Sequence, residues 1–115
     1  DGKPISVYNH GKMKRDFTYI DDIITGTRTA VDKNYPCEIF NIGNNKSEEL
    51  MDIICLIEEN LGKKADINFL PMQLGDVPVT YADIDKSIKK LDYNPTTSFN
   101  DGIKKFINWY KSYYV

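Results

Sequence analysis

The sequence has little of what most catalytic sites need. Histidine occurs only once, at His10, beside Gly11 in a predicted turn, which does not indicate a Ser-His-Asp or Cys-His arrangement. That histidine and the two cysteines show none of the paired spacings that zinc sites use. The glycines stand apart from one another, so no glycine-rich turn that could cradle a phosphate is present. These absences predict no catalytic group and no metal site in this chain.

Long apolar runs and a strong net charge are also missing. No stretch approaches the roughly 18 to 20 apolar residues of a membrane helix, and no charged start followed by an apolar segment marks a secretory signal. The chain carries 15 basic and 17 acidic residues, for a formal charge of −2. It has no broad positive field for nucleic acid or anionic lipid, so we expect neither a nucleic-acid partner nor a membrane. An anionic ligand must then be bound by a few local groups.

The chain that remains is small and ordinary in composition. Its 115 residues are 41% hydrophobic, which suits one soluble domain or part of one. Cys37 and Cys55 each lie inside an apolar pattern, which favours reduced, buried thiols over a disulfide. The sequence therefore predicts a cytoplasmic protein.

Short strands alternate with helices along the chain. The patterns predict strands at 5–9, 15–20, 37–43 and 65–71, the second with Phe17 and Tyr19 on one face. A helix capped by Asp21 or Asp22 should end before Pro36. A strongly amphipathic helix should run from Ser47 to a stop at Gly62.

Two further helices are indicated by paired capping residues. Thr80 and Asp83 have capping-box spacing before a short helix that ends near Leu91, and Ser98 and Asp101 repeat it before the last helix. One side of the last helix is apolar and wide enough to need a partner surface: Ile103, Phe106, Ile107, Tyr110, Tyr113 and Tyr114. The order predicts an α/β fold with few short strands and about four helices, as part of something larger.

Tyr8 and Lys12 match the Tyr-x3-Lys spacing of short-chain dehydrogenase catalysis. That pair works because four residues on an α-helix bring both side chains to one face. The residues between them here are Asn9, His10 and Gly11, a hairpin signal. We therefore reject them as a catalytic pair.

Three collinear stretches carry a family resemblance. "GKPISVYNHGKMKRDFTYIDDI", "FNIGN" and the segment from "LPMQLGDV" to "NWYKSYY" resemble the C-terminal portion of the extended short-chain dehydrogenase/reductases, and look closest to UDP-glucuronate 4-epimerases. The resemblance covers nearly the whole chain. It implies a Rossmann-like fold whose missing N-terminal domain holds NAD and the tyrosine-lysine pair. Leu74, where proline is usual, and the short link from Val31 to Cys37 depart from the family pattern.

The resemblance also implies a binding role for five residues. Arg15 is similar to the arginine that pairs with the pyrophosphate of a UDP-sugar, a task that suits a planar, permanently charged guanidinium. Ser6 and Tyr8 correspond to the strand positions that clasp uracil, and Gln73 and Asp76 to the loop that touches phosphate and ribose. From the residues alone, Arg15 could equally be a strand arginine paired with a carboxylate, Tyr8 an ordinary strand tyrosine, and Gln73 part of a polar loop. Asp16 points to the opposite face and should not pair with Arg15.

We therefore expect residues 1–115 to be a C-terminal substrate-binding segment. The resemblance implies that the segments 15–43 and 98–114 pack on the NAD-binding domain, while 5–9 and 47–93 build the substrate lobe. The whole enzyme would convert UDP-glucuronate to UDP-galacturonate for polysaccharide biosynthesis, through a 4-keto sugar formed with NAD, and a homodimer is compatible with this family. This segment alone should be inactive. The alternatives are a fragment of a nucleotide-sugar 4,6-dehydratase or decarboxylase, and a non-catalytic interaction module.

Overall fold

Four α-helices and four very short strands make up the part of the chain that the structure describes. The computed structural model describes residues 2–114. It is flat and elongated, 47 × 37 × 19 Å. The elements, in chain order, are β1 (Ile5–Val7), the 3-10 helix η1 (Tyr8–Gly11), β2 (Lys14–Arg15), α1 (Ile20–Lys33), β3 (Glu48–Glu49), α2 (Leu50–Leu61), β4 (Ile67–Phe69), α3 (Asp85–Leu91) and α4 (Phe99–Tyr114). The predicted α/β class with few strands and about four helices is confirmed.

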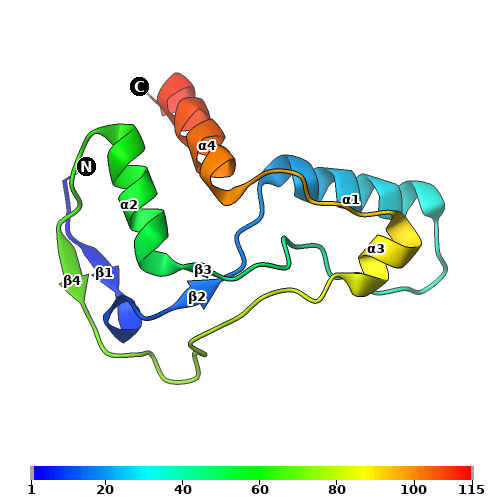
Figure 1. Cartoon of the computed structure of the whole chain (residues 1–115), viewed down its shortest axis with the longest axis horizontal. Helices are drawn as coiled ribbons and strands as arrows, with labels where there is room; N and C mark the ends of the chain where they lie inside the picture. The colour runs from blue at the N-terminus through cyan, green and yellow to red at the C-terminus, as the bar shows by residue number, and fades with distance from the viewer. Residues whose placement is uncertain (1, 115) are drawn as a thin grey trace.

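The chain crosses repeatedly between two ends of the molecule (Figure 1). At the strand end, β1 pairs in parallel with β4, and α2 lies beside α4. At the helix end, α3 packs against α1. Between them, β2 pairs antiparallel with β3, and Lys14 forms an isolated bridge to Val79. The middle of the molecule thus consists of segments that connect one end to the other.

Each end buries its own apolar residues. At the helix end, the buried Ile84, Leu91 and Tyr93 pack with the partly buried Ala30, Phe40, Ile42 and Ala82. Elsewhere the buried hydrophobic residues are Val7, Met13, Ile53, Ile54 and Ile107. The segment from Ile84 onward, which the expected substrate lobe includes, packs with α1.

Among the described residues, one predicted strand is much shorter than expected and another is absent. The strand expected at 15–20 is paired only at Lys14 and Arg15, because its partner β3 has just two residues. The segment 37–43 forms no strand, since side chains satisfy its carbonyls in place of a neighbouring strand. The Ser87 hydroxyl donates to the carbonyl of Asn41, and the Tyr93 hydroxyl to that of Gly43.

Several predicted helix caps are wrong. Neither Asp21 nor Asp22 caps α1: its N-cap is Tyr19, with no side-chain cap hydrogen bond. The second helix begins at Leu50, not at Ser47, whose hydroxyl donates to the carbonyl of Thr80. Before α3 the N-cap is Ile84, again without a side-chain cap bond. Asp22 and Ser47 bind distant segments of the chain, whereas Asp83 accepts the N–H of Asp85, only two residues away.

Other local predictions are confirmed. Gly62 ends α2 with a left-handed φ of 67°. At the start of α4, Ser98 Oγ accepts the N–H of Asp101 at 3.1 Å. Tyr8 to Gly11 form a 3-10 turn with left-handed residues at 9 and 10, so Tyr8 and Lys12 do not share an α-helix. The thiols of Cys37 and Cys55 are free as expected, but both are exposed, and the prediction that they are buried is wrong.

Candidate functional site

Arg15 lies where the strand β2 meets the loop that follows β4. Its Nη2 donates to Oδ1 of Asp76 at 2.7 Å, and this ion pair is about one third exposed, at 27% and 32% for the two side chains. Its Nη1 donates to the carbonyl of Lys14 at 2.8 Å and to that of Pro78 at 3.3 Å. Two of the five predicted residues, 61 positions apart in sequence, are therefore in direct contact.

The guanidinium retains free donor capacity. Arginine has five N–H donors in a planar fork, and the hydrogen bonds within residues 2–114 involve its two Nη atoms but not Nε. The Nε–H and the second Nη2 proton can therefore meet a phosphate oxygen while Arg15 stays paired with Asp76. The arrangement suits an anion that arrives beside an already fixed guanidinium.

Gln73 and Asp76 belong to one tight turn. The N–H of Asp76 donates to the carbonyl of Gln73 at 3.2 Å, and Gly75 has a φ of 82°, a backbone angle that favours glycine. Asp76 Oδ1 also accepts the N–H of Val77 at 2.8 Å, so its carboxylate is held by its own loop as well as by Arg15. Gln73 and Leu74 are exposed.

Ser6 and Tyr8 lie on the strand end, next to the same loop. Ser6, in β1, is exposed and opposite Asn68 in β4, while Tyr8 is half-buried at the start of η1. Backbone hydrogen bonds tie this segment to Leu70, three residues before Gln73: the N–H of Leu70 donates to Val7, and that of His10 donates to Leu70. Within residues 2–114, no hydrogen bond or ion pair joins either residue to Arg15. The structure therefore brings Ser6 and Tyr8 near the start of the loop and Arg15 near its end.

Asp16 lies beside this candidate site, and the sequence predicts for it only that it does not pair with Arg15. The structure shows no ion pair between the two. The carboxylate of Asp16 accepts three backbone N–H groups, from Asn44, Asn45 and Ala82, each at 3.0 Å. The only signal for Asp16 in the sequence is its place next to a candidate binding arginine, which does not reveal donors 28 to 66 residues away.

The local charge around Arg15 is close to neutral. Asp76 balances Arg15, and Glu49 balances Lys14 at 2.6 Å. The hydrogen bond to Glu49 and its negative charge raise the pKa of Lys14. An anion at this place thus depends on well-placed donors more than on a positive field.

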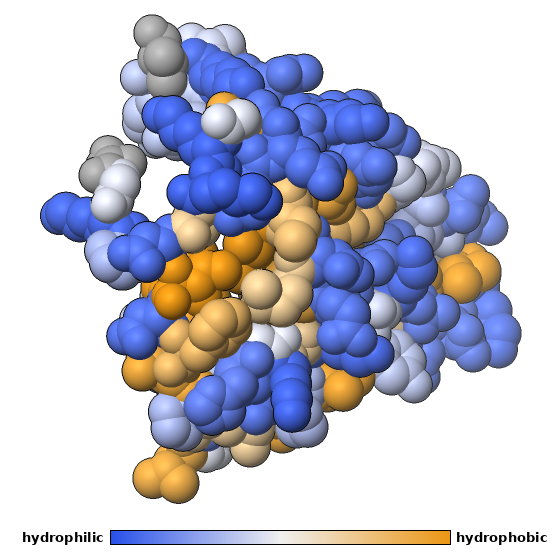
Figure 2. Space-filling view, turned by 60° about the vertical axis from the view of Figure 1, so that its left-hand side comes forward, coloured by the Kyte–Doolittle hydropathy of each residue, from blue (hydrophilic) through white to orange (hydrophobic). Residues whose placement is uncertain are grey.

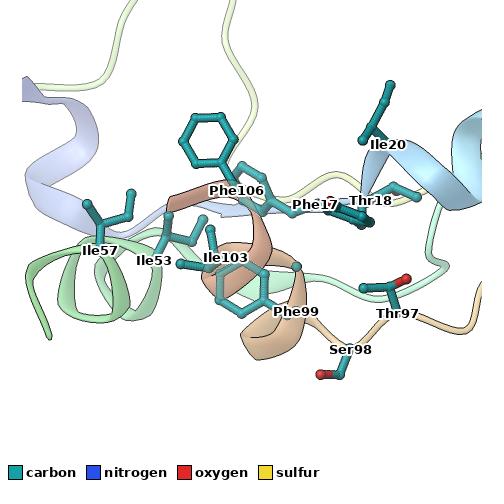
Figure 3. A pocket seen from close by; sticks show the side chains of 12 residues that line it. Phe17, Thr18, Ile20, Ile53, Ile57, Thr97, Ser98, Phe99, Ile103 and Phe106 are labelled. Atoms are coloured by element: carbon teal, nitrogen blue, oxygen red, sulfur yellow. The ribbon is translucent and has the colours of Figure 1, made fainter. Parts of the chain in front are cut away.

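A separate apolar groove of about 420 Å³ lies on another part of the molecule. Ile53 and Ile57 from α2 line it together with Ile103 and Phe106 from α4, and Phe17 lies beside them (Figure 3). Orange hydrophobic patches interrupt the hydrophilic surface of the face in Figure 2. The groove has no charged side chain among its lining residues, so it is suited to an apolar surface and not to a nucleotide.

The part of the chain that the structure describes contains no glycine-rich turn that could hold a dinucleotide by itself. A dinucleotide-binding turn needs clustered glycines between a strand and a helix. The segment before α1 is "FTY", and the helix N-termini of α2 and α4 lack glycine clusters as well. Residues 2–114 contain no group of three or more His, Cys, Asp or Glu that could hold a metal ion, and no helix long and apolar enough to cross a membrane.

Comparisons with known proteins agree on one family. Residues 1–43 match the NAD dependent epimerase/dehydratase family. UDP-glucuronate 4-epimerase 4 of Arabidopsis thaliana is 41% identical over 98% of this chain and 30% of its own length. The crystal structure of UDP-glucuronic acid 4-epimerase from Bacillus cereus, in complex with UDP-glucuronic acid and NAD, superposes with a TM-score of 0.86 at 38% identity, over 98% of this chain and 37% of that one.

The chain belongs to the extended short-chain dehydrogenase/reductases. It corresponds to the C-terminal part of their epimerase fold, as the resemblance implied. An uncharacterised protein of Methanocaldococcus jannaschii is 53% identical over 95% of the chain and 33% of its own length. The chain thus spans about a third of the length of these curated relatives.

The relatives differ in the length of the aligned region. The alignment with the Arabidopsis enzyme extends over 130 positions, more than the 115 residues of this chain, so that enzyme has additional residues. The alignment with UDP-glucuronate 4-epimerase of Thermodesulfobacterium geofontis extends over only 110 positions at 42% identity. Relatives that carry the same enzyme name therefore differ in length over this part of the chain.

Proposed function

We propose that this chain is the substrate-binding, C-terminal part of an NAD-dependent nucleotide-sugar 4-epimerase that acts on UDP-glucuronate. The main support is the position of Arg15, which lies against Asp76 in the 73–76 turn. The family resemblance associates both Arg15 and this turn with the diphosphate part of a UDP-sugar. UDP-glucuronate 4-epimerases among the relatives support the choice of sugar.

Each of the five residues has a proposed task. Arg15 binds the diphosphate through the donors that its protein contacts leave free, and Asp76 keeps the guanidinium in place while its turn reaches toward the ribose. Gln73 offers a neutral amide to the phosphates. Ser6 and Tyr8 clasp the uracil, with the ring of Tyr8 covering the base. A grip confined to the nucleotide leaves the sugar free to turn, which an epimerase requires.

The apolar groove supports the proposed domain arrangement. Residues 1–115 then form one substrate-binding segment whose α2–α4 groove and α1 face pack on an NAD-binding Rossmann domain. The exposed apolar residues Ile20 and Ile24, each 56% exposed, suit such a contact. NAD would be bound by that domain, in keeping with the lack of a dinucleotide-binding turn here. A cytoplasmic location and a homodimer stay predictions.

Titration of the 115-residue chain with UDP tests the proposal. Loss of a hydrogen bond from a charged donor costs about 1.5–3 kcal/mol, so Arg15→Ala should weaken UDP binding about tenfold or more. Arg28→Ala is the matched control, because Arg28 is 82% exposed on α1 and pairs only with Asp32, at 3.7 Å. Isothermal calorimetry, with circular dichroism to verify folding, gives both affinities.

Two outcomes would contradict the proposal. Equal UDP affinity in wild type and Arg15→Ala would show that Arg15 does not bind the diphosphate. Absence of UDP binding by the folded chain would favour an interaction module whose apolar groove binds another protein. Turnover of UDP-glucuronate with NAD by this chain alone would overturn the assignment of the chemistry to another domain. A dehydratase is the remaining alternative, but dTDP-glucose 4,6-dehydratase from Bacillus anthracis, at 24% identity, supports the fold alone.

A further inference from the structure

The carboxylate of Asp16 joins three separate segments of the chain. Its Oδ1 accepts the N–H of Asn44, and its Oδ2 accepts those of Asn45 and Ala82, all at 3.0 Å. Hydrogen bonds to an ionised acceptor are stronger than neutral ones. Three of them on one side chain fix the strand β2 to the turn at 44–45 and to the end of the loop that begins after β4.

That loop is held to β2 by three consecutive residues. The N–H of Lys14 donates to the carbonyl of Pro78 at 2.8 Å, and the carbonyl of Lys14 accepts the N–H of Thr80 at 3.2 Å. Arg15 binds Asp76 and Pro78, and Asp16 binds Ala82. The residues that set the direction of the guanidinium are therefore in the same stretch that Asp16 anchors.

The anchor has almost no room to move. A Cβ atom placed on Gly43 would lie 2.6 Å from Cβ of Ala82 and 3.0 Å from Oδ2 of Asp16. The three segments thus touch at van der Waals distance, and the carboxylate is the polar bond between them. The loop from Pro71 to Tyr81 is exposed at most positions, and besides Asp16 it is held by Lys14 and Arg15 and by the Ser47 hydroxyl, which donates to the carbonyl of Thr80.

We propose that Asp16 is a positioning residue for the diphosphate grip: by binding Ala82 it holds the 76–80 segment on β2 and so aims Arg15. The inference rests on the proposed function and assigns to Asp16 a task in binding, beyond a contribution to stability. The inference predicts that loss of Asp16 affects one part of the ligand and not the other. Loss of Asp16 should harm recognition of the diphosphate and leave recognition of the nucleoside.

Asp22 provides the matched control. Its carboxylate also accepts three hydrogen bonds, from the N–H groups of Thr96 at 3.1 Å and Thr97 at 3.0 Å and from the Thr96 hydroxyl at 3.3 Å. These contacts join α1 to the segment before α4 and do not involve the loop at 73–80. Asp16→Ala and Asp22→Ala therefore each leave backbone donors unpaired, but only the first does so beside Arg15.

The experiment compares UDP with uridine. Ligand-observed NMR measures both dissociation constants for the 115-residue chain, and the ratio of the uridine value to the UDP value reports the diphosphate contact. We expect Asp16→Ala to lower this ratio about tenfold, as loss of a charge-assisted hydrogen bond would, and Asp22→Ala to leave it unchanged. The double variant Arg15→Ala/Asp16→Ala should match Arg15→Ala, since Asp16 acts through Arg15. If Asp16→Ala does not fold, Asp16→Asn replaces it, because an amide cannot accept all three bonds.

A second readout needs no ligand. Amide hydrogen exchange at Thr80, corrected for global stability, should be faster in Asp16→Ala than in Asp22→Ala. Three results would each overturn the inference. The ratio of uridine to UDP dissociation constants could be unchanged in Asp16→Ala, it could fall equally in Asp22→Ala, or hydrogen exchange at Thr80 could be unchanged. Failure of the proposed function would give a different result. Wild type and Arg15→Ala would then have the same ratio of uridine to UDP dissociation constants, and hydrogen exchange at Thr80 would still test whether Asp16 holds the loop.

Discussion

Gly43 allows two segments of the chain to approach closely, and replacing it by alanine tests how rigid that approach is. The residue is buried, and its φ is not positive, so space and not backbone conformation calls for glycine here. An added Cβ would lie 2.6 Å from Cβ of Ala82, whereas carbon atoms in contact prefer about 3.5–4.0 Å. The two segments would have to separate by roughly 1 Å. The same movement would stretch the hydrogen bond from Tyr93 to the Gly43 carbonyl, now 2.9 Å.

The expected cost follows from these contacts. Overpacking of a well-packed site costs about 1–3 kcal/mol, so we expect Gly43→Ala to lower the free energy of unfolding by about 2 kcal/mol. Ala82→Gly alone removes a partly buried methyl group, worth about 0.8 kcal/mol, and adds the backbone entropy of glycine, about 0.5–1 kcal/mol. If the steric contact is the cause, the double variant should be more stable than the sum of the two single effects predicts, by about 1 kcal/mol.

Urea unfolding followed by circular dichroism measures all four proteins, with equal m-values as the check for a common two-state transition. Additivity within about 0.5 kcal/mol would refute the steric argument, because distant and independent sites behave in that way. A Gly43→Ala variant as stable as wild type would show that the two segments adapt freely, and that Asp16 is not confined by them.

Two buried ionisable groups predict opposite pH effects. Burial, with the negative charges of Asp22 and Asp16, raises the pKa of Tyr93 from 10.0 to about 12; the unfolded chain therefore loses this proton first, and stability should fall between pH 10 and 12 by about 2–3 kcal/mol. Tyr93→Phe should lose about 1 kcal/mol at neutral pH and lack this alkaline decrease, as urea unfolding against pH would measure. Burial raises the pKa of Asp22, but the N–H groups of Thr96 and Thr97 outweigh it and leave the pKa below 3.8. The ionised Asp22 carboxylate therefore stabilises the fold above about pH 4, and this stabilisation is lost in acid. In thermal unfolding, the melting temperature of Asp22→Asn should fall less steeply with decreasing pH than that of wild type. An equally steep fall would contradict a lowered pKa for Asp22.

Signals within one or two helical turns predicted the structure well. The spacing of Ser98 and Asp101 identified the start of α4, and Gly62 the end of α2, because each acts on a backbone only a few residues away. The α/β class followed from the same local patterns. These parts of the fold depend on the chain nearby and on little else.

Extended segments and polar caps were harder, since their partners are distant. The apolar residues from 37 to 43 form no strand, because a strand needs a neighbouring strand, and here the hydroxyls of Ser87 and Tyr93 donate to the carbonyls of Asn41 and Gly43. Asp22 lies in the first turn of α1, and its carboxylate binds Thr96 and Thr97, 74 and 75 residues later. A sequence shows which groups can accept a hydrogen bond, but it does not show which distant donor will form that bond.

The same distinction explains the candidate site. Family resemblance was enough to associate Arg15 with the 73–76 turn, since both occur in recognisable motifs, and the roles of the five residues stay predictions. Asp16 was missed as an anchor because its three donors come from two segments that no local pattern connects to it. The sequence pattern indicated only that the side chain of Asp16 points to the opposite face from Arg15.

The charge balance gives this anchor its importance. Arg15 and Lys14 each face a carboxylate, so the site has little positive field with which to draw in a diphosphate, and exposed ion pairs of this kind contribute only about 0–1 kcal/mol. Recognition must then come from donors held in the right direction before the ligand arrives, because ordering a flexible arginine on binding would consume most of the energy gained. The guanidinium is directed by carbonyls and a carboxylate of a loop that is itself exposed. The half-buried carboxylate of Asp16, the residue directly after β2, supplies the rigidity that the loop lacks.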